Sequence, residues 1–179
     1  YTNSTGAVTT TNAGSAAAAN ATFTVVGGIA AAKAFAPAAI ASGATSTLTI
    51  TLTNPNTTTA VMGIAFTDTY PAAIANSGTP GAVTTCAGGA VTAVASGPSV
   101  ALSGASLAAG ASCTVTVQVT SSTAGTHANN LGSVTAANAP TTTGASANLT
   151  VQAAPTLAKS FTPSTIGPDG TSALRLVLS

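Results

Sequence analysis

The chain repeats its own sequence at a fixed spacing of 126 residues. Residues 1–53 align with residues 127–179 without a gap, and 19 of these 53 positions are identical. The identical positions include Asn3, Lys33, Phe35 and Pro37, each with its counterpart 126 residues later, although Lys and Phe are rare in this chain. Such a sequence is expected to fold as a row of similar units rather than as one continuous domain.

The repeat divides the chain into three parts. We expect residues 1–27 to be the end of one repeat, residues 28–153 a complete repeat, and residues 154–179 the start of the next. The two end pieces do not complete one another, because neither contains the equivalent of residues 54–126. The sequence therefore predicts a tandem array in the natural protein.

The composition argues against several classes of function. Alanine (42 residues) and threonine (35 residues) together make up 43% of the chain. The only charged side chains are Lys33, Asp68, Lys159, Asp169 and Arg175. Three cations cannot neutralise a series of phosphates, so nucleic-acid binding is not expected. No stretch reaches the roughly 18 continuous apolar residues of a membrane span. With so few ionisable groups, an enzyme is not expected either.

Alternating apolar and polar residues are the dominant local pattern. In Ser46–Thr53, Leu48, Ile50 and Leu52 alternate with threonine, and Cys113–Thr120 alternates in the same way. This period of two predicts strands with one buried face and one solvated face. The segments Ala21–Val26 and Ala147–Gln152, at the ends of the first two repeats, show the same alternation. Further strands are expected at 30–36, 60–68, 82–86, 90–95, 98–102 and 127–135.

The strand pattern predicts an all-β fold. Alanine is the best helix former, but the longest alanine run, Ala16–Ala19, has only four residues. Turn signals such as Asn54-Pro55-Asn56 and Gly88-Gly89 separate the expected strands. Seven or more short strands in one repeat are typical of an immunoglobulin-like β-sandwich. We therefore expect tandem immunoglobulin-like sandwiches, one complete and flanked by two partial ones.

Several segments of the complete repeat resemble a known family. They are Lys33–Pro37 (KAFAP), Ser46–Asn56 (STLTITLTNPN), Phe66–Pro71 (FTDTYP), Gly110–Val117 (GASCTVTV) and Gly125–Asn129 (GTHAN). In these segments the chain is similar to the immunoglobulin-like conserved repeats of large bacterial surface and adhesin-like proteins. The resemblance implies a tandem extracellular module and implies no catalytic activity.

Three polar residues are expected on the apolar face of their strands. By strand alternation Lys33 points with Phe35, Asp68 points with Met62, Ile64 and Phe66, and Asn129 points with Leu131. Within the complete repeat Lys33 and Asp68 are the only charged residues, and because an unpaired buried charge is costly, the two should meet. One interpretation is a buried ion pair in which Asn129 satisfies the remaining hydrogen bonds. The other is an intramolecular isopeptide bond between Lys33 and Asn129, with Asp68 moving protons, an arrangement similar to that of several adhesin and pilin domains.

The cysteines and the histidine suggest structural roles. Cys86 and Cys113 lie 27 residues apart at expected strand ends and predict one disulfide, with two buried free thiols as the alternative. A zinc site needs three or four ligands, and His127 is the only further candidate. Tyr1 occupies the position of His127 in the neighbouring copy, which favours a corner hydrogen bond for this residue. We expect no metal, no cofactor and no catalytic residue.

These features together predict a structural, non-catalytic module of a long extracellular or cell-surface fibre of a bacterium, serving adhesion or filament formation. Its expected partners are neighbouring repeats and identical chains. The alternative function is an adhesin module that binds a glycan or a protein, for which Tyr70 is the candidate stacking residue, or a filament subunit that exchanges strands.

Overall fold

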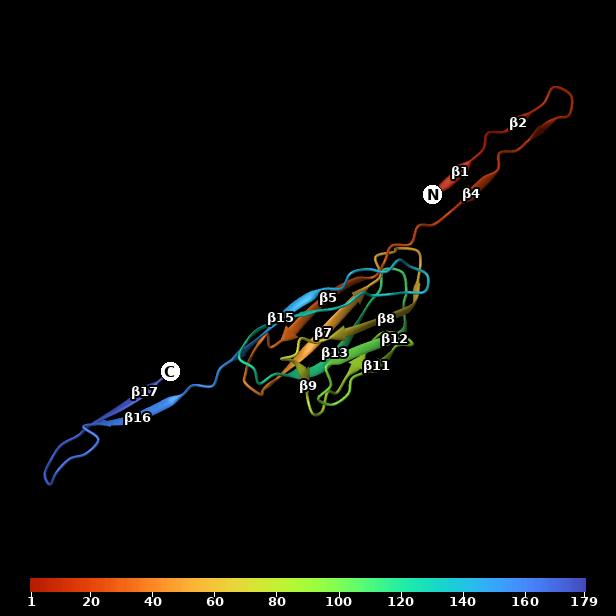
Figure 1. The fold of residues 1–179 in the computed structure, drawn as a ribbon. Coiled ribbons are helices and arrows are strands. Elements are labelled where there is room, and N and C mark those ends of the chain that lie inside the picture. The colour runs from red at the N-terminus through yellow and green to blue at the C-terminus, as the bar shows by residue number, and fades with distance from the viewer.

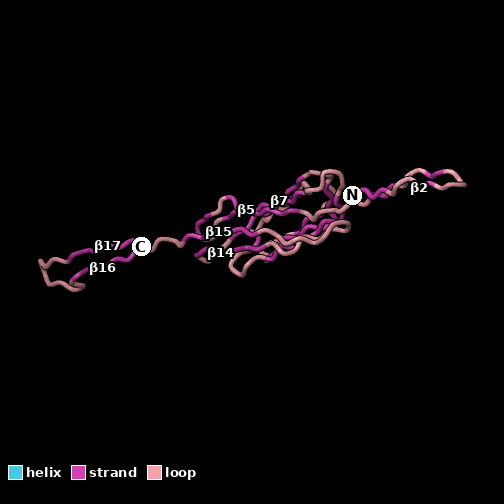
Figure 2. The backbone as a smooth tube through the Cα atoms, turned by 90° about the horizontal axis from the view of Figure 1, so that it is seen from above, coloured by secondary structure: helices cyan, strands magenta, loops and turns pink.

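The computed structural model describes all 179 residues. A central β-sandwich carries one long hairpin at each end, and the two hairpins extend in opposite directions (Figures 1 and 2). Every regular element is a strand. The structure contains no helix that is long and hydrophobic enough to cross a bilayer.

One layer of the sandwich is an antiparallel sheet in the order β10–β13–β7–β5, with the short β9 also paired to β13. Its strands are β5 (Ala30–Ala36), β7 (Thr45–Thr53), β9 (Ala75–Asn76), β10 (Val83–Thr84) and β13 (Ser112–Thr120). The long central pair β7–β13 keeps one register from Ser112 opposite Thr53 to Thr120 opposite Thr45. Strand β5 forms an edge of this sheet.

The other layer consists of two three-stranded sheets, β11–β12–β8 and β14–β15–β6. Their strands are β6 (Ala39–Ala41), β8 (Val61–Thr69), β11 (Ala90–Thr92), β12 (Ser99–Leu107), β14 (Gly125–Asn130) and β15 (Ser146–Gln152). The two sheets meet where Ala65 and Thr135 exchange backbone hydrogen bonds of 3.0 and 2.9 Å. All pairs are antiparallel except β15–β6. The chain crosses between the layers after β5, at the cis peptide bond between Ala36 and Pro37.

The core between the layers follows the sequence alternation. Leu48, Ile50 and Leu52 of β7 are completely buried, while the threonines between them are partly exposed. Strand β13 contributes Val115 and Val117 in the same way. A single cluster of 24 buried apolar residues joins both layers. The expected all-β sandwich is therefore confirmed for residues 30–152.

Two glycines change the alternation of the β8–β12 pair. Gly63 (φ +65°) and Gly104 (φ +68°) each lie at a register shift between these strands. Both conformations are left-handed and favour glycine. The bulge at Gly63 turns Met62 to the solvent, where it is 55% exposed, and Val61 takes its place in the core. The prediction that Met62 shares the face of Asp68 is therefore wrong.

Other sequence expectations also differ from the structure. The strand expected at 127–135 ends at Asn130, and beyond it only single bridges involve Val134 and Thr135. The strand expected over Ala21–Val26 is limited to β4 (Asn20–Thr22). The sequence pattern does not predict β6 and β9, because two or three residues are too few to show an alternation of apolar and polar side chains.

The strands of the terminal hairpins pair in the same registers as the corresponding strands of the sandwich. The first contains β1 (Thr2–Ser4), β2 (Val8–Thr9), β3 (Ser15–Ala16) and β4, and the last contains β16 (Leu157–Thr162) and β17 (Ala173–Leu178). Asn3 pairs with Ala21, as Asn129 pairs with Ala147 in β14–β15. Lys159 pairs with Leu176, as Lys33 pairs with Ile50 in β5–β7. Each pair of registers is related by the 126-residue spacing.

Cys86 and Cys113 form a disulfide, as the sequence predicts, with their Cα atoms 4.9 Å apart. Cys86 follows β10, and Cys113 lies on the neighbouring β13. Neither cysteine is free, so the alternative of two buried thiols is wrong. The bond links the segment between β10 and β11 to β13, an inner strand of the first sheet.

Candidate functional site

Three strands from both layers bring Lys33, Asp68 and Asn129 together in the core. Lys33 lies on β5 in the first layer, whereas Asp68 on β8 and Asn129 on β14 lie in the second. Each side chain points inward because it alternates with exposed residues on its strand. The three residues are far apart in the sequence and are assembled only by the sandwich.

The Asp68 carboxylate contacts both other side chains. Lys33 Nζ donates to Asp68 Oδ1 over 2.7 Å, and Asn129 Nδ2 donates to Asp68 Oδ2 over 3.0 Å. The side chains of Lys33 and Asp68 are 0% exposed, and Asn129 is completely buried as well. Asn129 Oδ1 has no hydrogen-bond partner. The site is therefore a water-excluded group in which one carboxylate oxygen faces each nitrogen.

Burial makes the charge on Lys33 costly. Desolvation lowers the pKa of the Lys33 ammonium, while its hydrogen bond to Asp68 and the charge of Asp68 oppose this effect. A lower pKa means that the Lys33 ammonium loses its proton more readily, and a neutral, desolvated lysine amine is a nucleophile. The arrangement can therefore hold an ion pair or release a reactive amine beside a carboxamide.

Tyr70 belongs to a second buried polar group and not to the surface. It directly follows β8 and is 5% exposed, so it cannot serve as the stacking residue that the sequence suggested. Its hydroxyl donates to Asn76 Oδ1 over 2.8 Å, and Asn76 Nδ2 donates to the carbonyls of Val94 and Ser99. Burial raises the pKa of Tyr70, and the charge of Asp68 adds to this effect.

Replacing Tyr70 with phenylalanine is expected to lower the free energy of unfolding by about 1–3 kcal/mol near neutral pH, because buried Asn76 Oδ1 loses its donor. The difference should narrow above a pH of about 10. There the unfolded chain ionises Tyr70 at its ordinary pKa of 10.0, whereas the folded state keeps the hydroxyl protonated, so only the natural chain loses stability. Denaturant titrations of both chains on either side of this pH measure the difference. A difference that is the same at both pH values would contradict the explanation.

A pair of asparagines holds the segment between the first hairpin and the sandwich. Asn56 accepts from the Gly27 amide over 2.7 Å and donates from Nδ2 to the Gly27 carbonyl over 2.9 Å. Asn54 is completely buried and accepts from Asn56 Nδ2 over 2.7 Å. Thr142 donates to the carbonyl of buried Ile29 over 2.7 Å. The sequence indicated only a turn at Asn54-Pro55-Asn56, because nothing local identifies Gly27 as its partner.

The remaining candidates have structural surroundings. His127 Nε2 lies 2.7 Å from the Thr123 carbonyl oxygen, which is the corner hydrogen bond expected for this position. No three His, Cys, Asp or Glu side chains cluster as a metal site would require.

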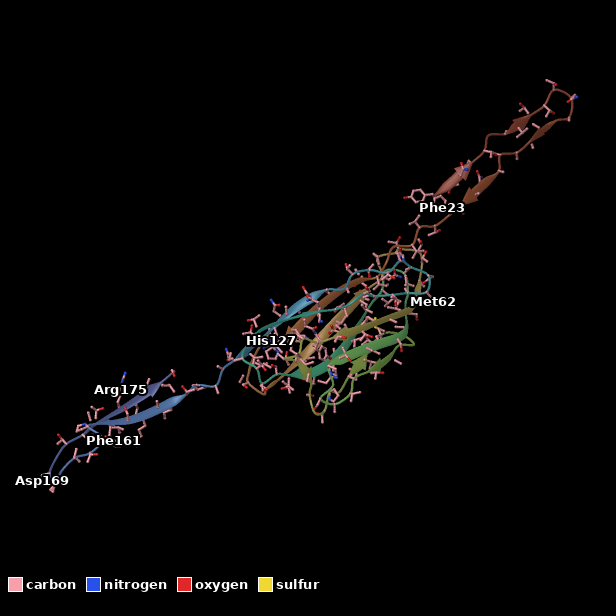
Figure 3. The ribbon with its side chains drawn as sticks, viewed as in Figure 1. Phe23, Met62, His127, Phe161, Asp169 and Arg175 are labelled. Carbon is pink, nitrogen blue, oxygen red and sulfur yellow. A yellow bond between two sulfur atoms is a disulfide. The ribbon has the colours of Figure 1, made fainter.

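A shallow groove over β8 and β12 is lined mainly by small uncharged residues, among them Ala65, Thr67, Ala101, Ser103, Ser133 and Thr135. Figure 3 shows His127 at the end of the sandwich nearer the last hairpin and Met62 at the other end.

Comparison with known proteins places the fold and the family. No curated protein matches the sequence. Among solved structures, the chain is similar to a cohesin module from a Clostridium perfringens ATCC13124 family 33 glycoside hydrolase, with a TM-score of 0.50 and 15% identity. That match covers 73% of this chain and 100% of the module, and it supports the immunoglobulin-like β-sandwich fold. The model of a domain of unknown function, DUF7933, matches residues 30–151. These residues span the sandwich from β5 to β15, and the chain therefore belongs to the DUF7933 family.

Proposed function

We propose that the chain is a structural, non-catalytic section of a tandem array that forms an extracellular fibre or stalk on a bacterial cell. The observation that carries this proposal is the placement of the two hairpins. They leave the sandwich at opposite ends (Figures 1 and 2) and reproduce the registers of its last and first hairpins. Units joined in this way form a row whose length increases with each repeat.

The strand order suits a unit that bears tension. The chain enters the sandwich at β5 and leaves it after β15, and β15 pairs in parallel with β6. Tension on the two ends pulls these parallel strands in opposite directions along their length. The hydrogen bonds between them, including Thr150 to Ala38 and Ser42 to Gln152, are then loaded together and do not open one after another.

The joint before the sandwich supports the same function. Gly27 is held by Asn56 and Ile29 by Thr142. Gly28 lies so close to the Thr142 methyl group and the Pro140 carbonyl oxygen that a Cβ atom there would clash with both. A segment fixed by hydrogen bonds and close packing transmits direction between neighbouring units, as a stalk requires.

Replacing Asn56 with alanine is expected to loosen this joint, because the Gly27 amide and carbonyl both lose their partner. Amide hydrogen exchange at Gly27 should accelerate by about tenfold or more. Asn138→Ala is the matched control, since Asn138 also bonds a backbone amide and carbonyl, those of Met62 and Ala60, but lies outside the joint. Equal acceleration at Gly27 in both variants would contradict a specific role for Asn56.

The surface and the disulfide support an extracellular location. Disulfides persist in oxidising compartments, and Cys86–Cys113 is buried in the sandwich. The complete repeat has only two charged side chains, and both are enclosed. The outer strand faces are therefore largely threonine and alanine, and they offer little charge repulsion against an identical chain. Neighbouring repeats and identical chains are the partners proposed.

Single-molecule pulling on the full chain tests the mechanical part of the proposal. With handles at the two termini, the sandwich should unfold at a higher force than with handles at Ala44 and the C-terminus. The second geometry pulls β6 and β15 from adjacent ends, so their hydrogen bonds open in turn. Ala44 suits an attached handle because it is exposed between β6 and β7, whereas the neighbouring Gly43 has a left-handed φ of +80° that favours glycine. Equal forces in both geometries would count against a tension-bearing unit.

Antibody labelling of intact cells tests the location. An antibody against the sandwich should label cells of the source bacterium without permeabilisation, and labelling only after permeabilisation would overturn the proposal. Screening the chain against glycans and surface proteins tests the alternative of an adhesin module. Specific binding that is lost when the groove residue Thr67 is enlarged to tryptophan would favour that alternative.

A further inference from the structure

The geometry points to a covalent modification of this protein: an intramolecular isopeptide bond between Lys33 Nζ and Asn129 Cγ, formed with Asp68 as the proton carrier. The inference rests on the three buried side chains and does not require the proposed stalk. The reaction brings together an amine, a carboxamide and a carboxyl group, and it needs no cofactor.

Asp68 holds both reacting groups in one enclosed space. Its Oδ1 lies 2.7 Å from the Lys33 amine, and its Oδ2 lies 3.0 Å from the Asn129 amide nitrogen. A carboxyl group with one oxygen at each nitrogen can take a proton from the attacking amine and deliver one to the leaving nitrogen. The side chains are completely buried, so water does not compete as nucleophile, and fixed proximity replaces a bimolecular encounter.

The reaction balances in atoms and charge. The Lys33 ammonium first gives a proton to the Asp68 carboxylate, which leaves a neutral amine and a neutral acid. The amine nitrogen attacks Asn129 Cγ, the Nζ–Cγ bond forms, and the Cγ–Nδ2 bond breaks. Asp68 gives its proton to the departing Nδ2 and receives one from Nζ. The products are a secondary amide, a protonated Asp68 and one molecule of ammonia.

The product satisfies the buried polar groups better than the ion pair does. Before the reaction the site encloses two opposite charges and leaves Asn129 Oδ1 without a partner. Afterwards no charge remains, and the protonated Asp68 has an O–H donor for the new amide carbonyl. The amide N–H can donate to the other Asp68 oxygen. Removal of buried charge and satisfaction of a buried acceptor both favour the crosslinked state.

The repeat offers matched positions that lack the complete site. Lys159 and Asn3 are the counterparts of Lys33 and Asn129, and both lie exposed on the terminal hairpins. Neither hairpin contains a residue that corresponds to Asp68. Only Lys33 and Asn129 are therefore buried together beside a carboxyl group, and Lys159 serves as an internal control.

The first test is the mass of the full chain after reduction and complete denaturation. We expect the sequence mass less one ammonia. Because a succinimide at an asparagine would give the same loss, a tryptic digest must accompany it. Trypsin can cut this chain only after Lys33, Lys159 and Arg175. An acylated Lys33 is not a cleavage site, so residues 1–159 should remain in one piece, whereas free Lys33 gives separate peptides 1–33 and 34–159.

Variants identify the residues responsible. Lys33→Arg keeps the buried cation, and Asn129→Ala removes the carboxamide; both should restore the full mass and be free of the crosslink. Asp68→Asn should leave Lys33 cleavable because the proton carrier is gone. Lys159→Arg should keep the ammonia loss and the uncut 1–159 fragment. Circular dichroism reports whether each variant folds, and the result for the natural chain is decisive in any case.

Full sequence mass with complete cleavage after Lys33 in the natural chain would overturn the inference and leave the buried ion pair as the function of these residues. That outcome would leave the proposed stalk standing, since neither the pairing of β6 with β15 nor the labelling of intact cells requires the crosslink. In a crosslinked chain the new bond would carry tension directly from Lys33 to Asn129 and leave β6 unloaded. The two pulling geometries are therefore compared in Lys33→Arg, where equal forces would remove the mechanical argument and leave the isopeptide bond standing.

Discussion

Replacement of Lys33 by methionine is expected to lower the free energy of unfolding by about 4–5 kcal/mol through loss of the crosslink alone. The Lys33–Asn129 bond would close a loop containing the 95 residues between them, and a crosslink across a loop of about 100 residues restricts the unfolded chain by this amount in the chain-entropy model. Asp68 would also be left buried without its cation. Guanidinium unfolding of the full chain measures the change.

Joint replacement of all three polar residues separates the crosslink from the ion pair. In Lys33→Met/Asp68→Leu/Asn129→Leu no buried polar group is left unpaired. If the site were only an ion pair, apolar replacement would be nearly neutral or stabilising. With the crosslink, the triple variant should stay about 4 kcal/mol below the natural chain, because the loop is no longer closed. Full recovery of stability in the triple variant would contradict the crosslink.

Lys159→Met is the matched control for the lysine replacement. Lys159 lies exposed on the last hairpin, over the ring of Phe161 at 5.7 Å, and no carboxylate contacts it. An exposed substitution of this kind should change the free energy of unfolding by no more than about 0.5 kcal/mol. A large effect of Lys159→Met would show that lysine replacement itself disturbs the chain.

Removal of the disulfide is expected to cost about 3–4 kcal/mol. Cys86 and Cys113 are 27 residues apart, and closing a loop of this length restricts the unfolded chain by that amount. Both cysteines are buried, so Cys86→Ala/Cys113→Ala also loses some packing. Denaturant unfolding of the natural chain and the double variant, each with and without reductant, measures the effect. Reductant should destabilise the natural chain and leave the variant unchanged.

The disulfide and the proposed isopeptide bond would be nested in the sequence, and this has a measurable consequence. The loop from Cys86 to Cys113 lies inside the loop from Lys33 to Asn129. With the disulfide intact, the outer loop is effectively shorter by the inner one, so the two contributions should fall short of additivity by only a few tenths of a kcal/mol, about 0.3 in the loop-entropy model. A much larger deviation would indicate that one bond forms only when the other is present.

Local alternation of apolar and polar residues was sufficient to predict much of this fold. The Leu-Thr and Val-Thr patterns of β7 and β13 predicted their buried and exposed faces, because successive side chains of a strand point to opposite sides. The same reasoning placed Lys33, Asp68 and Asn129 in the core. The parity of Met62 was wrong because a bulge at Gly63 shifts the alternation, and a glycine in a strand does not by itself reveal a bulge.

The sequence by itself determined the 126-residue period, the all-β class, the disulfide partners and the inward direction of three polar side chains. Tertiary structure alone decided that one Asp68 carboxylate faces both nitrogens, that Asn56 holds Gly27, and that β6 pairs in parallel with β15. Tyr70 likewise became a core residue only through packing. The physical reason is that strand periodicity is a local property, whereas the register between strands distant in sequence is fixed by the packing of two complete layers.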